Sequence, residues 1–385
     1  MHQALQIREI RSIVCGFAYD RCKGDALRLG LTCHAFLEPA LNLLWHEVHD
    51  FTKLLRCFPS DIWTEERHDR GYNQTTLKSI RFPTGQDWAR PLYYAKRIRL
   101  LTFEDDFNTR DVQASFYTTL AITCPDNAPF RRLQCLQLFR YQPEHASMMF
   151  FYRLLLGASV QQLEVHFQEW ETSEHAMFFV NLAVSRCTPT HVDLECANLS
   201  DSALGHIISE WSQLQRLSLG AVSTKTMQQI AVLPALRVFR VRDTRTKNAI
   251  HGNMLDVEGH DTFPVLQRLI VRNSTIEACT WLLNLMDRSP VQKLDMHFSS
   301  TASAAEWRHL IECLPDAVDN QTLERLVLFD DTWPRETMRD IVTSAMVGPL
   351  LCFHELRHLT IRPRCPVHLD GATIMDMAKA LARLR

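Results

Sequence analysis

Four stretches of this sequence follow one pattern: LQRLSL at 214–219, LQRLIV at 266–271, VQKLDM at 291–296 and LERLVL at 323–328. In each stretch, apolar residues occupy the first, fourth and sixth positions, while most of the other positions are polar. Such alternation over a short segment is typical of a β-strand with one buried face. Because the pattern recurs along the chain, it predicts a fold built of repeats.

Ten copies of this template are assigned, and the separations between their first residues run from 22 to 38 residues. The range brackets the period of leucine-rich repeats, roughly 20–29 residues, with several longer insertions. The repeats are therefore expected to be irregular. The other copies are Ala95/Ile98/Leu100, Leu133/Leu136/Leu138, Val160/Leu163/Val165, Pro189/Val192/Leu194, Leu236/Phe239/Val241 and Leu356/Leu359/Ile361.

Segments with helical periodicity separate these strands. A single strand and a single helix cannot bury their apolar faces alone, so neighbouring repeats must stack into a solenoid. The fold class is therefore predicted to be α/β, with an irregular solenoid of parallel strands inside and helices outside over residues 91–385. The array is expected to be truncated at the C-terminus, because Ala382–Arg385 resembles the opening of another strand. The expected helices include Asp201–Trp211, Ile276–Met286, Ala304–Leu314, Glu336–Met346 and Asp370–Arg385.

The first part of the chain follows a different pattern. Two apolar stripes at helical spacing predict a helical segment over residues 1–50, followed by a linker and N-terminal cap over 51–90. The first stripe comprises Ile7, Ile10, Ile13 and Val14, and the second comprises Leu37, Leu41, Leu44, Trp45 and Val48.

Composition limits the classes of function. The 385 residues are 46% apolar and 22% charged, with a formal net charge of −2, which favours neither nucleic acid nor an anionic membrane as partner. The sequence contains no Gly-rich phosphate-binding motif, no CxxC pair and no apolar run of transmembrane length. No signal peptide is evident among the first residues, so a cytoplasmic and/or nuclear location is expected, with the twelve cysteines reduced.

One motif suggests an enzyme. His354-Glu-Leu-Arg-His358 matches the HExxH pattern of zinc proteases, in which a helix places both histidines on one face. Here the motif overlaps the template copy that begins at Leu356, and on a strand the histidines would lie about 13 Å apart. We therefore expect no metal, no cofactor and no enzymatic activity.

Residues Leu27–Val48, LRLGLTCHAFLEPALNLLWHEV, resemble the second half of an F-box, and Leu5–Val14, LQIREIRSIV, resembles its first helix. The segments Lys53–Trp63 and Asp87–Phe103 are similar to F-box-like, leucine-rich-repeat proteins abundant in mushroom-forming fungi. The resemblance covers essentially the whole chain and is most specific from Cys33 to Trp63. One departure is Arg8, which stands where F-boxes usually carry proline.

The resemblance implies a substrate-recruiting adaptor of a Skp–cullin–F-box ubiquitin ligase, whose F-box docks on the Skp-type adaptor and whose repeats bind the substrate protein. Two alternatives remain open. The N-terminal helices can simply cap the solenoid, or the chain can be an interaction scaffold with a degenerate F-box and no ligase role. The implied adaptor-binding residues are Ile7, Ile10, Ile13, Leu31, Cys33, Phe36, Leu41, Leu44 and Trp45.

The outward-facing third position of the template is often basic. Strands stack about 4.8 Å apart, so Arg268, Lys293 and Arg325 are expected to form a cationic column on the concave face. The basic residues at this position can simply keep the exposed face of the strands soluble, and Asp295 can offset their charge within the protein. The sharper hypothesis is a surface for an acidic or phosphorylated segment of the substrate. Its predicted residues are Arg216, Arg240, Arg268, Lys293 and Arg325, and the full row reads Arg97, Cys135, Gln162, His191, Arg216, Val238, Arg268, Lys293, Arg325 and His358.

Overall fold

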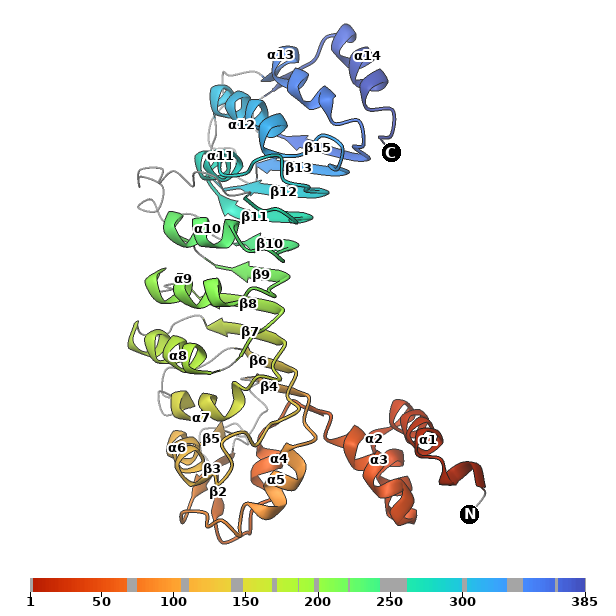
Figure 1. Ribbon diagram of the computed structural model, residues 1–385, viewed down its shortest axis with the longest axis vertical. Coiled ribbons are helices and arrows are strands. Elements are labelled where there is room, and N and C mark those ends of the chain that lie inside the picture. The colour runs from red at the N-terminus through yellow and green to blue at the C-terminus, as the bar shows by residue number, and fades with distance from the viewer. Residues whose placement is uncertain are drawn as a thin grey trace. The chain divides into compact units, whose positions relative to one another are not determined.

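Parallel strands and helices alternate along most of the chain in the computed structural model of the protein (Figure 1). The chain divides into two compact units, Met1–Cys187 and Thr188–Arg385, and each is described by itself. The structure describes residues 3–67, 75–104, 111–139, 148–167, 172–185, 187–196, 201–220, 222–242, 262–299, 303–330, 342–363 and 366–384.

The first unit begins with a helical segment in which three helices pack against one another around Cys15, Phe36 and Ala40. Gly30 allows two of these helices to approach closely, because a Cβ atom at this position would lie 2.8 Å from the Cβ of Ala40. This helical segment consists of η1 (Gln3–Gln6), α1 (Arg8–Arg21), α2 (Lys23–Thr32) and α3 (His34–Leu44).

A parallel sheet follows in the first unit. Its first strand, β1 (Glu47–Val48), follows α3 almost directly, and the sequence pattern did not reveal this strand. The sheet continues through β4 (Leu100–Glu104), β6 (Cys135–Phe139) and β7 (Gln162–Phe167), with α6 (Ala114–Thr123), α7 (Met148–Leu155) and α8 (Thr172–Val184) between or after the strands. The segment before β4 contains α4 (Thr52–Leu55), α5 (Ala89–Ala95) and a hairpin, β2 (Trp63–Arg67) and β3 (Thr75–Ser79), to which β5 (Asp111–Val112) adds a third strand.

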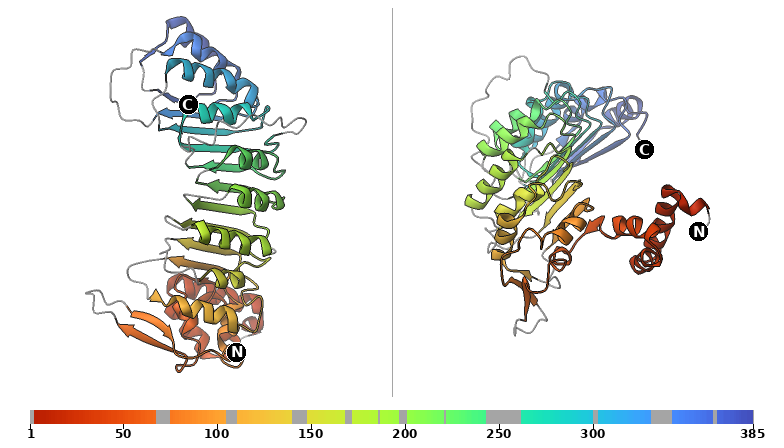
Figure 2. Two further views of the ribbon diagram at one scale, coloured as in Figure 1. Left: turned by 90° about the vertical axis from the view of Figure 1, so that its left-hand side faces the viewer. Right: turned by 60° about the horizontal axis from the view of Figure 1, so that its bottom comes forward.

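The second unit is a larger parallel sheet whose strands follow one another in chain order, and its helices lie along one face of that sheet (Figure 2). Its strands are β8 (His191–Cys196), β9 (Arg216–Leu219), β10 (Val238–Val241), β11 (Arg268–Ser274), β12 (Lys293–Phe298), β13 (Arg325–Asp330) and β15 (His358–Arg362). The helices are α9 (Asp201–Glu210), α10 (Thr224–Ala231), α11 (Ile276–Asn284), α12 (Ala304–Ala317), α13 (Ser344–Val347), η3 (Gly348–Cys352) and α14 (Gly371–Ala380), and β14 (Val342–Thr343) pairs with β16 (Val367–His368).

The template positions align from strand to strand, as the sequence predicted. In the second unit the third positions are direct neighbours, so that Arg268 lies beside Lys293 and Lys293 lies beside Arg325. From β8 to β13 the first, fourth and sixth positions are buried, and Leu266 and Leu269, for example, are 0% exposed. In the last copy Leu356 is buried, whereas Leu359 and Ile361 are partly buried. A solenoid-like α/β arrangement of parallel strands is therefore confirmed.

The first template copy was misassigned. Leu100 pairs with Cys135 and Leu101 with Leu136, so the copy is Ile98/Leu101/Phe103 and not Ala95/Ile98/Leu100. Both alignments place apolar residues at all three positions, so the pattern alone could not choose between them. The structure excludes the first alignment because Ala95 is the last residue of α5.

The expected helices at 201, 276 and 304 are confirmed as α9, α11 and α12, and α14 corresponds to the helix expected at 370. Side-chain caps start several of them, including a capping box at α12 formed by Ser303 and Glu306. For the helix expected over Glu336–Met346, residues 336–341 lie outside the described residues, and Val342–Thr343 forms β14 instead. After α14, the described residues form a turn and not the opening of a strand.

Leu269→Ala is expected to lower the free energy of unfolding by about 2–5 kcal/mol, because it leaves a cavity between β10 and β12. Gln267→Ala, two residues earlier and exposed, is the matched control and should change stability by less than about 0.5 kcal/mol. The shift of the urea midpoint measures both values. Equal midpoints for the two variants would contradict the assigned burial of the fourth template position.

Candidate protein-interaction surfaces

The helical segment exposes large apolar side chains. On α1 and at its N-cap, Ile7, Ile13 and Phe17 are 49%, 58% and 73% exposed, and on α2 Leu27 and Leu31 are 47% and 72% exposed. Ile13 and Phe17 are four residues apart, as are Leu27 and Leu31, so each pair lies on one face of its helix. Exposed apolar side chains gathered on one small element are typical of a surface that binds another protein.

The structure places the predicted adaptor-binding residues in three different environments. Ile7, Ile13 and Leu31 are exposed, whereas Ile10, Cys33, Leu41 and Leu44 are partly buried. Phe36 belongs to the core of the helical segment, and Trp45 stacks on Tyr94 with 4.5 Å between ring centroids.

The sequence reasoning missed Phe17 and Leu27. Phe17 continues the α1 stripe by one turn beyond Ile13, and Leu27 stands one turn before Leu31. The signal that would have found both residues is thus the helical spacing already used for their neighbours.

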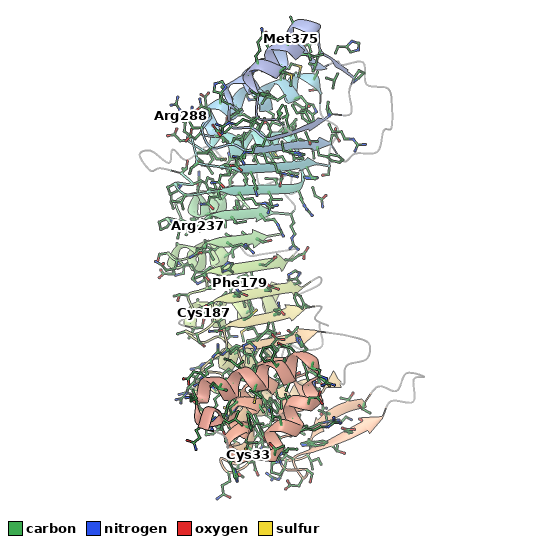
Figure 3. The ribbon with its side chains drawn as sticks, turned by 90° about the vertical axis from the view of Figure 1, so that its right-hand side faces the viewer. Cys33, Phe179, Cys187, Arg237, Arg288 and Met375 are labelled. Atoms are coloured by element: carbon green, nitrogen blue, oxygen red, sulfur yellow. The ribbon has the colours of Figure 1, made fainter. Side chains whose placement is uncertain are left out.

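Figure 3 looks onto the strands of the second unit, and the predicted basic residues belong to these strands. Arg268, Lys293 and Arg325 are adjacent and exposed, and Arg216 stands in the same register row, beyond Val238. Arg240 lies two residues after Val238, hence on the same face of the sheet. The structure therefore brings all five predicted substrate-binding residues to one face. Arg97, the first residue of the predicted row, lies outside it: its side chain is 3% exposed and paired with Glu38.

Asp295 offsets part of this positive charge. Its carboxylate accepts a hydrogen bond of 3.0 Å from Nε of Arg325 on one side, and Nη2 of Arg268 lies 3.6 Å away on the other. The carboxylate is 9% exposed, whereas each guanidinium side chain is 44% exposed. Because one acid serves two arginines and Lys293 stands between them, the column keeps a net positive charge.

A cluster of four arginines overlaps the column at Arg268. Arg240 is central, and Arg242, Arg268 and Arg272 are close enough for their charges to act on it. Burial, followed by the positive charges of Arg242, Arg272 and Arg268, lowers the pKa of Arg240. Its Nε atom is buried and has no hydrogen-bond partner among the described residues.

Arg242 is the neutralised member of the cluster. It donates to Asp193 at 3.0 Å and also to Glu195, both on β8, two strands away from β10. Gly220 directly follows β9; its N–H donates to the carbonyl of Leu194, and the N–H of Arg242 donates to the carbonyl of Leu219. These bonds place Gly220, which has no side chain, between Glu195 and Arg242. Arg242 is therefore neutralised by direct ion pairs, and the charge of Asp193 acts on Arg240 as well.

Arg272 was not among the predicted binding residues. It follows Val271 at a register shift in β11, where Asn273 adopts a left-handed backbone with φ of 53°. A bulge of this kind changes the direction of side chains relative to the strand pattern, so the six-residue template could not place Arg272.

The HExxH motif does not lie on a helix. His354 precedes β15 and its Nδ1 lies 3.3 Å from the carbonyl oxygen of Ala380, while His358 opens β15 with Nε2 3.1 Å from Oγ1 of Thr360. Within the described part of the chain, no group of three or more His, Cys, Asp or Glu residues is arranged to hold a metal ion. Burial raises the pKa of the Cys187 and Cys279 thiols to about 12, which disfavours the thiolate form that metals need.

Neither the protein-family models nor the curated proteins compared with this chain match it. The F-box resemblance therefore depends on the residues quoted above. Among the helices that the structure describes, none is long and apolar enough to cross a bilayer.

Asp295→Asn is expected to strengthen binding to a polyanion column and to shift elution to higher salt, because Arg268 and Arg325 lose their shared counter-charge. The free energy of unfolding should fall by about 1–3 kcal/mol, because the charged carboxylate is replaced by an amide that has only one acceptor oxygen for the two guanidiniums. Glu210→Gln on α9 removes the same charge from a helix and is the control. If both variants elute at the same salt concentration, Asp295 does not control the potential of the strand face.

Proposed function

We propose that this chain is a substrate-recruiting adaptor of a Skp–cullin–F-box type ubiquitin ligase. In this proposal, α1–α3 form an F-box-like segment that docks on the Skp-type adaptor, and the leucine-rich-repeat strand face of the second unit binds the substrate protein. The observation that carries it is the exposure of large apolar side chains on a small helical segment placed before an array of parallel repeat strands.

The helical segment supports docking energetically. Burying an apolar side chain of the size of Phe17 or Leu31 contributes about 1.5–3 kcal/mol, and both are more than 70% exposed in the free chain. A segment of three short helices buries little core by itself, and its core here centres on Cys15, Phe36 and Ala40. A partner that covers the exposed residues would stabilise it further.

The strand face supports an anionic substrate segment. The Nε atom of Arg240 has no hydrogen-bond partner among the described residues. Arg272, whose charge acts on Arg240, is exposed, and so is Lys293 on β12. A guanidinium can donate two parallel hydrogen bonds to a carboxylate or phosphate, and a phosphorylated side chain brings about −1.5 to −2 charges. The proposed ligand is therefore an acidic or phosphorylated segment of the substrate.

A scaffold without a ligase role is the second candidate, and Arg8 is the observation that favours it. Arg8 is the first residue of α1, where F-boxes usually carry proline, and a positive charge at a helix N-terminus is unfavourable. Glu9 in the same turn has the favourable charge, and α1 runs for 14 residues without the proline.

Phe17→Ala combined with Leu31→Ala is expected to weaken binding to a purified Skp-type adaptor by about 30-fold or more, since two buried anchors contribute at least about 2 kcal/mol together. The control is Ile122→Ala with Val184→Ala, which truncates two side chains of similar exposure on α6 and α8. Wild-type affinity in the folded Phe17/Leu31 variant would rule out docking through this surface. Absence of binding in the wild-type chain itself would favour the scaffold.

Arg240→Gln combined with Arg272→Gln is expected to reduce the proteins that co-purify under proteasome inhibition, while adaptor binding is retained. Arg308→Gln with Lys225→Gln removes the same charge from exposed positions on α12 and α10 and serves as the control. Quantitative mass spectrometry of the co-purifying proteins measures the effect. An unchanged set would move the substrate site away from the arginine cluster.

A further inference from the structure

A second concentration of positive charge lies in the first unit, in a pocket of about 410 Å³. Its lining comes from separate parts of the chain: Arg8 opens α1, Lys96 and Arg97 follow α5, and Arg131 and Arg132 stand in the turn before β6. Neither the proposed adaptor surface nor the proposed substrate face includes these residues. The pocket therefore has no role in the function proposed above.

Among the described residues that line this pocket, Glu38 is the only acid, and it is already engaged. Glu38 accepts a hydrogen bond of 2.6 Å from Nη2 of Arg97 and another from the hydroxyl of Tyr93. The hydrogen bond from Tyr93, together with the charge of Arg97, lowers the pKa of Glu38, so the carboxylate is ionised at neutral pH. Glu38 thus neutralises Arg97 and leaves the other cations of the pocket without compensation from the lining.

Arg97 is the buried member of the pocket. Its side chain is 3% exposed, and its guanidinium carbon lies 3.9 Å from the centroid of the Tyr93 ring. Nη1 donates to the Tyr93 carbonyl and Nη2 to Glu38, but the buried Nε atom has no partner among the described residues. A buried donor without a partner is costly and is commonly satisfied by a ligand or an ordered water.

The remaining cations converge from three elements. Lys96 and Arg132 are exposed, as is Arg8, and Arg131 has an acidic partner outside the lining, Asp126, at 3.0 Å. Like charges held around one pocket repel each other, and a multivalent anion removes that repulsion while accepting hydrogen bonds from several donors. A single carboxylate could reach only some of these donors, whereas a group with several phosphoryl oxygens can contact all three elements.

We propose that this pocket binds a small, multiply charged phosphate-bearing anion. Its volume lies within the range of pockets that hold small ligands, roughly 300–1,000 Å³. Such a ligand would join α1 to α5 and to the turn before β6, and so would hold the helical segment against the repeat strands of the first unit. Only this last consequence for adaptor geometry rests on the proposed function; binding of the anion does not.

The test is isothermal titration of the full chain with tripolyphosphate, at constant ionic strength and without any partner protein. We expect saturable binding at one site per chain and at least tenfold weaker binding of inorganic phosphate. A rise in the melting temperature with tripolyphosphate concentration should accompany it, since a ligand that binds only the folded state stabilises that state. Equal affinity for phosphate and tripolyphosphate would overturn the requirement for a multivalent anion.

Lys96→Gln combined with Arg132→Gln should weaken tripolyphosphate binding by at least tenfold. Both side chains are exposed, so the variant keeps the fold. The matched control, Arg90→Gln with Arg153→Gln, removes the same charge from exposed positions on α5 and α7 and should bind as the wild type does. Equal losses of tripolyphosphate affinity in the two variants would show that the effect comes from net charge alone, and would overturn the proposal. A loss seen in Arg240→Gln with Arg272→Gln but not in Lys96→Gln with Arg132→Gln would place the anion on the strand face and overturn the proposal.

Because these titrations use the isolated chain, they do not depend on whether a Skp-type adaptor binds. A chain that binds tripolyphosphate in the pocket and fails to bind the adaptor would contradict the ligase proposal alone. A chain that binds the adaptor with no saturable anion binding would contradict the pocket proposal alone.

Discussion

Successive repeats are joined by one backbone interaction that recurs through both units. The carbonyl at the second template position accepts hydrogen bonds from two N–H groups of the next strand. The carbonyl of Gln215, for example, accepts from Arg237 at 2.8 Å and from Val238 at 3.0 Å, and that of Gln292 accepts from Glu324 and Arg325 at 2.9 and 3.0 Å. A shift by one residue would break both bonds and expose the apolar positions, so the register is strongly specified.

This fixed register determines the electrostatics of the strand face. Once third positions are neighbours, a residue type that recurs at that position becomes a continuous row, and repulsion within the row must be offset. The chain offsets the positive charge of the strand face in two ways. Asp295 is shared by the arginines on either side, and Arg242 reaches across β9 to two acids on β8. The cluster around Arg240 is the part of the face that these acids leave positive, although the whole chain has a net charge of −2.

The sequence predicted most of the architecture because template and fold share one periodicity. It failed where another constraint replaced that periodicity. The first copy was placed three residues early because two overlapping alignments were equally apolar. The pairing of Leu101 with Leu136 and the end of α5 at Ala95 separate them. Strand β1 was missed because a strand of two residues, Glu47 and Val48, is too short to show an alternation of apolar and polar side chains.

The sites were less predictable than the strands. The basic residues of the strand face could be placed from the template, whereas Arg272 lies at a bulge, which no regular spacing describes. The pocket could not be predicted at all, because it joins Arg8 to Lys96 and Arg132, which are far apart in the sequence. Tertiary packing alone brings them together.

The junction between α3 and β1 has a mechanical consequence. Only Trp45 and His46 separate the end of the helix from the first strand; Trp45 is held by stacking on Tyr94, and the carbonyl of His46 accepts two N–H groups from Arg99 and Leu100. Two residues restrained in this way act as a stiff joint and not as a tether. A force or torque applied to the helices is thus transmitted to the first repeat strands. The sheet in turn sets the direction in which the helices point.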